Sequence, residues 1–111
     1  MYEYDQWAHL RRPLPNWWLD GAQRDPNYPR SAGIVFNIRK NTGEVFRCCV
    51  PFAALCGLAG DTIPLARVDQ LWDRYRDQLE SAAKRKIRSG DVRGGQVAIE
   101  LADLVLQNYE L

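Results

Sequence analysis

GIVFNIRKNTGEVFRCCV, residues 33–50, is the stretch that decides the fold of this chain. Apolar side chains occupy every second position on both sides of an Asn-Thr-Gly turn at 41–43: Ile34, Phe36, Ile38, Phe46, Cys48 and Val50. A period of two is typical of strands with one buried face, and Asn and Gly are turn residues. The stretch therefore predicts a β-hairpin.

A long amphipathic helix follows at residues 64–89. Its apolar side chains recur at spacings of three and four: Val68, Leu71, Trp72, Tyr75, Leu79, Ala82, Ala83 and Ile87. Pro64 stands near its start and Gly90 just past its end, as helix boundaries favour. One face of this helix is predicted to lie on the hairpin.

Shorter elements complete the order. Residues 51–60 indicate a short helix that starts at Pro51, QVAIEL at 96–101 a third strand, and ADLVLQNY at 102–109 a final short helix. The predicted fold class is α+β, with a small antiparallel sheet (the hairpin plus the third strand) covered by one long amphipathic helix and short helices. Residues 33–111 are expected to form this single domain.

Residues 1–32 form an arm of different composition. The arm holds six of the twelve aromatic residues and four of the six prolines in the chain. Proline disfavours long regular elements, whereas disordered tails are usually poor in aromatic residues. We expect the arm to pack on the domain.

The segment from Gly33 to about Leu104 resembles the family of short bacterial proteins known as domain of unknown function 1488. The resemblance lies in Val35-Phe36, Gly43, Val45, Cys48, Val50, Ala54-Leu55, Tyr75-Arg76, Leu79-Glu80, Ala82-Ala83, Lys86-Ile87, Gly90, Val97, Leu101 and Asp103-Leu104. It implies a small α+β fold in a bacterial, phage or mobile-element protein, and it implies no activity. Pro51 stands where that pattern usually has serine, and the aromatic arm lies outside the resemblance.

Composition excludes several functional classes. The net charge is +1, so no overall charge attracts nucleic acid or an anionic membrane. The sequence has no apolar run of membrane-spanning length and no secretory signal, so we expect a soluble cytoplasmic protein. The soft metal ligands are His9, Cys48, Cys49 and Cys56, without the spacing of a zinc site. We therefore expect no metal and no cofactor.

The main functional hypothesis is a non-enzymatic protein–protein interaction module, such as a regulator or inhibitor of a larger complex. Tryptophan, tyrosine and arginine are enriched in binding hot spots. The candidate surface is the arm together with the exposed side of the sheet, and the arm supplies the candidate partner-binding residues Tyr4, Trp7, Arg11, Arg12, Trp17 and Trp18. Two interpretations of the tryptophans stay open, a strap that completes the core or an anchor for a partner, and self-association also stays open.

Two alternatives belong to other classes. Nucleic-acid backbone binding would use the basic end of the long helix and the turn after it, at Lys84, Arg85, Lys86, Arg88 and Arg93. A thiol-based redox or hydrolytic enzyme would use Cys48, Cys49 or Cys56, and the reactivity of Cys49 would depend on its exposure. We expect no enzyme, because no catalytic constellation stands out.

Overall fold

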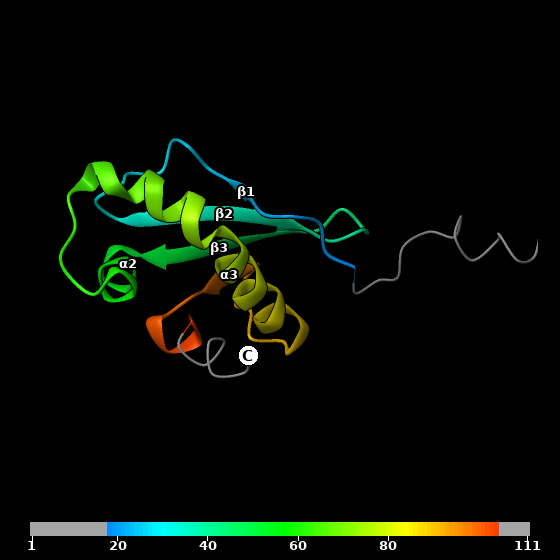
Figure 1. Cartoon of the computed structure of the whole chain (residues 1–111). Helices are drawn as coiled ribbons and strands as arrows, with labels where there is room; N and C mark the ends of the chain where they lie inside the picture. The colour runs from blue at the N-terminus through cyan, green and yellow to red at the C-terminus, as the bar shows by residue number, and fades with distance from the viewer. Residues whose placement is uncertain (1–17, 105–111) are drawn as a thin grey trace, which may run out of the picture.

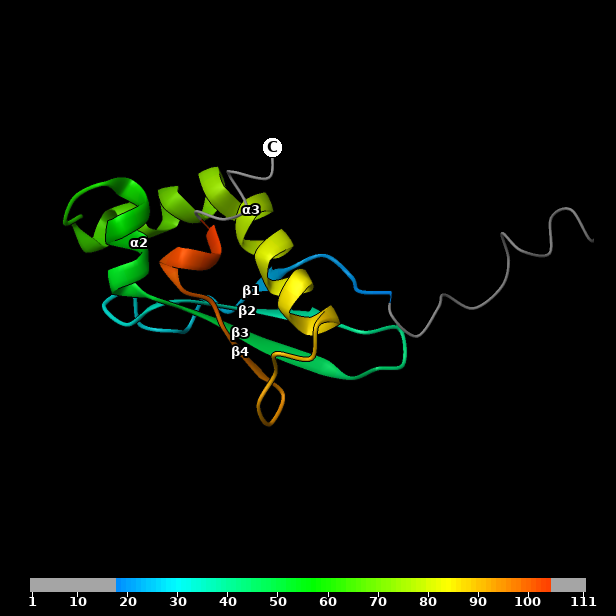
Figure 2. The same cartoon turned by 90° about the horizontal axis from the view of Figure 1, so that it is seen from below.

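The computed structural model describes residues 18–104, which form two layers, a sheet and a set of helices (Figure 1). The elements in chain order are β1 (Gln23–Arg24), β2 (Gly33–Arg39), β3 (Val45–Pro51), α2 (Phe52–Ala59), the 3₁₀ turn η1 (Leu65–Arg67), α3 (Val68–Arg88) and β4 (Gln96–Ala98). A further helical turn covers residues 101–104. Figure 2 shows that the helices lie on one face of the sheet. The α+β prediction is confirmed.

The sheet has the strand order β1-β2-β3-β4. The predicted hairpin is confirmed, with β2 antiparallel to β3 and Phe36 opposite Cys48. The sheet is mostly antiparallel, as expected, but its last strand differs, because β4 runs parallel to β3. The helices between these two strands carry the chain back to the same end of the sheet, as a parallel pair requires. The sheet therefore contains both antiparallel and parallel strand pairs.

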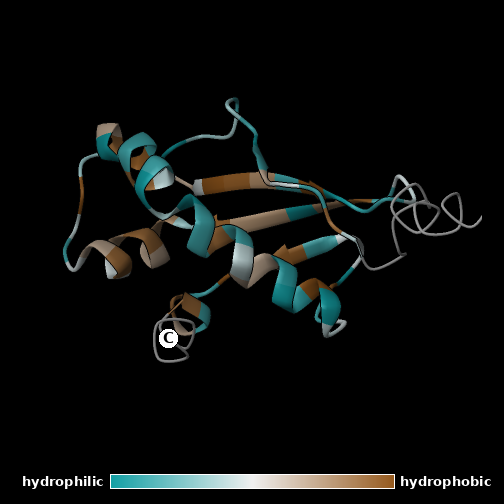
Figure 3. Cartoon of the chain, turned by 45° about the vertical axis from the view of Figure 1, so that its right-hand side comes forward, coloured by the Kyte–Doolittle hydropathy of each residue, from teal (hydrophilic) through white to brown (hydrophobic). Residues whose placement is uncertain are grey.

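The long helix is confirmed, as η1 followed directly by α3. Its buried side chains match the predicted apolar face: Val68, Leu71, Trp72, Leu79, Ala82 and Ala83. Hydrophilic and hydrophobic residues alternate along its ribbon (Figure 3). After the helix, Gly90 has a φ of 81°, and the N–H of Asp91 donates to the carbonyl of Lys86 at 2.9 Å. Glycine ends the helix here because it adopts this left-handed conformation without strain.

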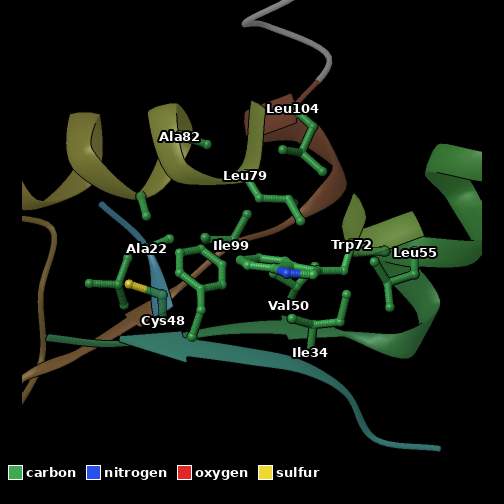
Figure 4. Packing of buried hydrophobic residues seen from close by; sticks show 14 of the residues in the cluster. Ala22, Ile34, Cys48, Val50, Leu55, Trp72, Leu79, Ala82, Ile99 and Leu104 are labelled. Atoms are coloured by element: carbon green, nitrogen blue, oxygen red, sulfur yellow. The ribbon is translucent and has the colours of Figure 1, made fainter. Parts of the chain in front are cut away.

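The hydrophobic core lies between α3 and the sheet. Figure 4 shows Trp72 in the middle of it, and the Phe36 and Trp72 ring centroids are 5.3 Å apart. Ile99 and Leu104, which follow β4, are fully buried in the same cluster. Among residues 18–104, no polar or charged side chain is buried. Hydrophobic burial therefore accounts for the association of the two layers.

The described part of the arm, residues 18–32, lies against the domain. Its strand β1 pairs with β2, which adds a fourth strand that the sequence analysis did not predict. Leu19 and Ala22 are buried in the core at 4% and 1% exposure. This part of the arm therefore belongs to the sheet layer. Tyr4, Trp7, Arg11, Arg12 and Trp17 lie outside the described residues.

Candidate docking surface

Trp18 is the candidate partner-binding residue that the structure describes. Its side chain is 39% exposed, whereas Leu19 beside it is 4% exposed. The backbone at this point joins the sheet, since Leu19 bridges Lys40 and the N–H of Asn41 donates to the Trp18 carbonyl at 3.2 Å. Trp18 is therefore an accessible indole on ordered backbone.

The sheet face opposite the helices, here called the outer face, carries no helix of the described chain (Figure 2). Strand register places these side chains, because Phe36 and Cys48 point into the core and their neighbours point away. The outer face comprises Gln23, Asn37, Arg39, Val45, Arg47, Cys49, Gln96 and Ala98. Val35 points to the same side but is 0% exposed, so the sheet is covered at that position. Polar side chains alternate there with small apolar ones.

Arg93 joins the same face through the turn before β4. Its N–H donates to the Gln96 carbonyl at 2.9 Å, and the Gln96 N–H donates back at 3.0 Å. Gly94 and Gly95 between them have φ values of 59° and 77°, which a two-residue turn of this kind needs. Since directly paired residues share a face, Arg93 lies beside Gln96.

A hollow of about 330 Å³ lies on the outer face near the hairpin turn. Its lining is Asp20, Gly21, Gln23, Asn37, Arg39 and Val45. Val45 is 45% exposed. Trp18 precedes Asp20 by two residues, so in an extended segment both side chains point to the same side. An apolar rim therefore borders a polar hollow.

Arg47 is held near the centre of the outer face. Its guanidinium lies 5.8 Å from the centre of the Tyr28 ring, and its Nη1 is 3.5 Å from Oδ2 of Asp25. The Arg47 side chain remains 41% exposed. These contacts orient the guanidinium and leave part of it accessible.

The predicted basic cluster does not form one surface. Lys84 pairs with Glu80 at 3.3 Å, and Nη2 of Arg85 donates to the Asp103 carbonyl at 2.9 Å. Arg93 instead lies on the outer face. Arg88 is exposed in the last turn of α3. Lys84 and Arg85 are thus engaged inside the fold.

Lys86 is tied down more strongly than its neighbours. Its Nζ donates to the Ala98 carbonyl at 2.7 Å and lies 3.0 Å from Asp103 and 3.5 Å from Asp91. Partial burial alone would lower the pKa of Lys86, but the hydrogen bond and charge of Asp103 and the charge of Asp91 outweigh it and raise that pKa. Lys86 connects α3 to β4.

The three cysteines lie in different surroundings, and all are free thiols. Cys48 is buried, and its thiol donates to the Phe46 carbonyl at 3.8 Å. Burial, with the neighbouring Cys49, raises the pKa of Cys48 to about 12, so it stays protonated at neutral pH. Cys49 is half-buried on the outer face, and Cys56 is half-buried in α2. Cys48 therefore has the character of a packed apolar residue.

A second hollow, of about 570 Å³, lies beside β4, with Cys49, Lys86, Asp91, Arg93, Gln96 and Glu100 in its lining. Cations and carboxylates are mixed in it, and Lys86 and Asp91 pair with each other. Within residues 18–104, no three His, Cys, Asp or Glu side chains gather as a metal site, and His9 lies outside that range. The hollow extends the outer face toward the edge of the sheet.

Sequence reasoning missed Arg39, Arg47 and Asn37 as parts of this surface. All three stand at outward positions of the hairpin, where polar residues are the rule. The signal that could have found the two arginines is the choice of arginine at both charged outward positions of the hairpin, Arg39 and Arg47.

Within residues 18–104, no helix has the length and apolar character that a membrane crossing requires. No family model and no curated protein matches the chain. A solved structure does match: a protein of unknown function from the DUF1488 family, from Shewanella loihica PV-4. It is 17% identical with a TM-score of 0.60, and the match covers 78% of this chain and 96% of that one.

This likeness shows the fold, so the fold that the resemblance to DUF1488 implied is confirmed. The match also extends further than expected. A coverage of 78% corresponds to about 87 of the 111 residues, more than the 79 residues from Gly33 to Leu111. Part of the arm therefore belongs to the shared fold, as β1 does in this structure.

Proposed function

We propose that the protein is a non-enzymatic protein-binding module whose docking surface is the outer face of the sheet near the hairpin turn. The observation that carries the proposal is the 39% exposure of Trp18, two residues before Asp20, which lines a polar hollow on the outer face. Exposed tryptophan beside arginine is the composition of binding hot spots. A regulator or inhibitor of a larger complex would work through such a surface.

The position of Trp18 also supports a role for the arm. The candidate residues Tyr4, Trp7, Arg11, Arg12 and Trp17 precede it in sequence. The chain enters the sheet at Trp18, next to Lys40 and Asn41 at the hairpin turn. A partner bound at the rim would therefore be within reach of the arm.

Cysteine chemistry lends little support to an enzyme. A nucleophilic thiol needs a lowered pKa, and burial moves the pKa of Cys48 in the opposite direction. Three free thiols fit a protein of the reducing cytoplasm. The nucleic-acid alternative is also weaker, because Lys84, Arg85 and Lys86 already bind groups of the fold.

The test compares Trp18→Ala with a matched control, Leu65→Ala. Leu65 is 48% exposed on η1, in the helical layer. Wild type and each variant are immobilised and incubated with extract of the native host. Bound proteins are then cross-linked to the immobilised chain and quantified by mass spectrometry. We expect Trp18→Ala to reduce capture of the wild-type partner at least tenfold and Leu65→Ala to retain it, with melting temperatures within about 4 °C of wild type.

Two results would contradict the proposal. One is equal capture by Trp18→Ala and wild type. The other is a wild-type chain that enriches no protein above an unrelated bait of the same size.

A further inference from the structure

Both edges of the sheet are occupied by contacts from within the chain. At β1, the N–H of Ala22 donates to Oε1 of Glu80 at 2.6 Å, and Nη2 of Arg76 donates to the Ala22 carbonyl at 3.1 Å. At β4, the outward groups of Gln96 pair with Arg93, and Lys86 donates to the Ala98 carbonyl. A partner strand that extends the sheet would have to break these bonds, so the outer face is the better docking surface.

Three arginines lie diagonally across that face. Arg39 lies on β2 and pairs with Val45, and Arg47 lies on β3 two residues beyond Val45. Arg47 pairs with Gln96 of β4, and Arg93 lies beside Gln96. Diagonal neighbours in a sheet are about 7–8 Å apart, and two strand spacings are about 10 Å. The line is therefore about 17 Å long, the length of about five extended residues.

The charges on this line are not balanced by the face itself. Within residues 18–104, neither Arg39 nor Arg93 forms an ion pair, and Arg47 has Asp25 at 3.5 Å. The strands place no carboxylate on the outer face; the acids nearby are Asp20, Asp25, Asp91 and Glu100 at its margins. Between the arginines stand the carboxamides of Asn37 and Gln96, which can donate hydrogen bonds.

We propose that the outer face binds an extended acidic segment of a partner protein, whose carboxylates are held by Arg39, Arg47 and Arg93. Guanidinium groups bind carboxylates in a two-point geometry, and alternate residues of an extended segment present carboxylates about 7 Å apart. This inference deepens the proposed function and rests on it, since it names the chemistry of the partner.

A protein fits this surface better than a nucleic acid does. The acids at its margins would repel a continuous phosphate backbone, whereas an acidic segment ends within the width of the sheet. The strands also place no aromatic side chain on this face on which bases could stack, and the nearby Tyr28 ring already lies against the guanidinium of Arg47.

The experiment titrates each protein into a fluorescein-labelled decaglutamate peptide and, separately, into a labelled ten-residue oligothymidylate. Fluorescence anisotropy is read at low salt. The double variant Arg39→Ala/Arg93→Ala is compared with Arg67→Ala/Arg74→Ala, which removes the same charge from exposed positions of the helical layer. We expect the first pair to raise the Kd for decaglutamate at least fivefold and the second to leave it within twofold.

Equal loss of affinity in both double variants would overturn the inference, because it would mean attraction by net charge alone. So would the absence of decaglutamate binding, or tighter oligothymidylate binding that depends on the same two arginines. The peptide titration tests this inference alone. The proposed function is tested separately, by the capture of partners with Trp18→Ala.

Discussion

Asp69 joins segments that are distant in the sequence. Its Oδ1 is 2.7 Å from Nη1 of Arg24, and its Oδ2 is 2.7 Å from Nη2 of Arg30. The hydrogen bonds from Arg30 and then Arg24 lower the pKa of Asp69 from 3.8 to about 2. The carboxylate also stands in the first turn of α3, where the helix dipole favours negative charge. One side chain thus fixes β1 and the segment after it to the start of α3.

Asp69→Asn is expected to lower the melting temperature at pH 7. Because the pKa in the folded state is lowered, the contribution of Asp69 is complete above its unfolded pKa and is lost as the pH falls from about 4 to about 2. The difference in melting temperature between wild type and variant should therefore shrink over that interval. Circular dichroism melts from pH 2 to pH 7 measure it.

Asp77→Asn is the control, an exposed carboxylate on the same helix. It should change the melting temperature little at any pH. If the difference in melting temperature between wild type and Asp69→Asn stays constant down to pH 2, the arginine contacts do not have the role given to them.

At the scale of elements, α3 acts on the sheet through two sets of side chains. Its apolar side fills the core with Trp72 and Leu79. Its polar side chains reach both sheet edges, since Arg76 and Glu80 bind the backbone at β1 and Lys86 binds it at β4. Unpaired strand edges promote aggregation, so these bonds protect the sheet as well as stabilise it.

Glu80→Ala is expected to destabilise the fold by about 1–2 kcal/mol, because it leaves the N–H of Ala22 without its charged acceptor. Urea denaturation gives the free energy of unfolding, and hydrogen exchange at Ala22 should become faster. Glu80→Gln keeps an acceptor oxygen and should cost less than half as much. If Glu80→Ala and Glu80→Gln cost the same, the acceptor at Ala22 is not the cause.

The elements that could be predicted are those with a sequence period. The hairpin has a period of two, and α3 buries the predicted stripe. Strand β1 could not be predicted, because Gln23–Arg24 is two polar residues whose pairing depends on β2 and on Glu80. The direction of β4 was also hidden, since a strand of three residues shows burial but not which way its neighbour runs.

The candidate site was predictable in part for a similar reason. Trp18 stands out by residue type, and the structure leaves it 39% exposed, while the choice between a strap and an anchor stays a matter for experiment. Arg39 and Arg47 have the sequence signature of ordinary solvent-facing strand positions. Arg93 was grouped with Lys84–Lys86 because they are close in sequence, whereas the Gly94-Gly95 turn places it on the opposite side of the sheet.

At the scale of the molecule, the described residues close a core of their own. Leu19 near one end and Leu104 at the other are both buried in a cluster that also contains the inward-pointing apolar residues of β2, β3 and β4. The two layers are joined by this cluster and by the contacts of Asp69, Glu80 and Lys86. A chain of this size gains most of its stability from one such core. Trp18, with 39% exposure, is not part of this cluster.

The whole-molecule prediction concerns removal of residues 1–17. If Leu19 and Ala22 supply the arm's share of the core, the shortened chain should melt within about 4 °C of the full chain, which corresponds to less than about 1 kcal/mol. Leu19→Ala in the full chain should instead cost about 2–4 kcal/mol, as buried leucines do. Thermal melts of the shortened chain and of Leu19→Ala distinguish the two interpretations of the arm, a strap or an anchor. A shortened chain that melts as low as Leu19→Ala would make the arm a strap; one that keeps its stability but loses partner capture would make it an anchor.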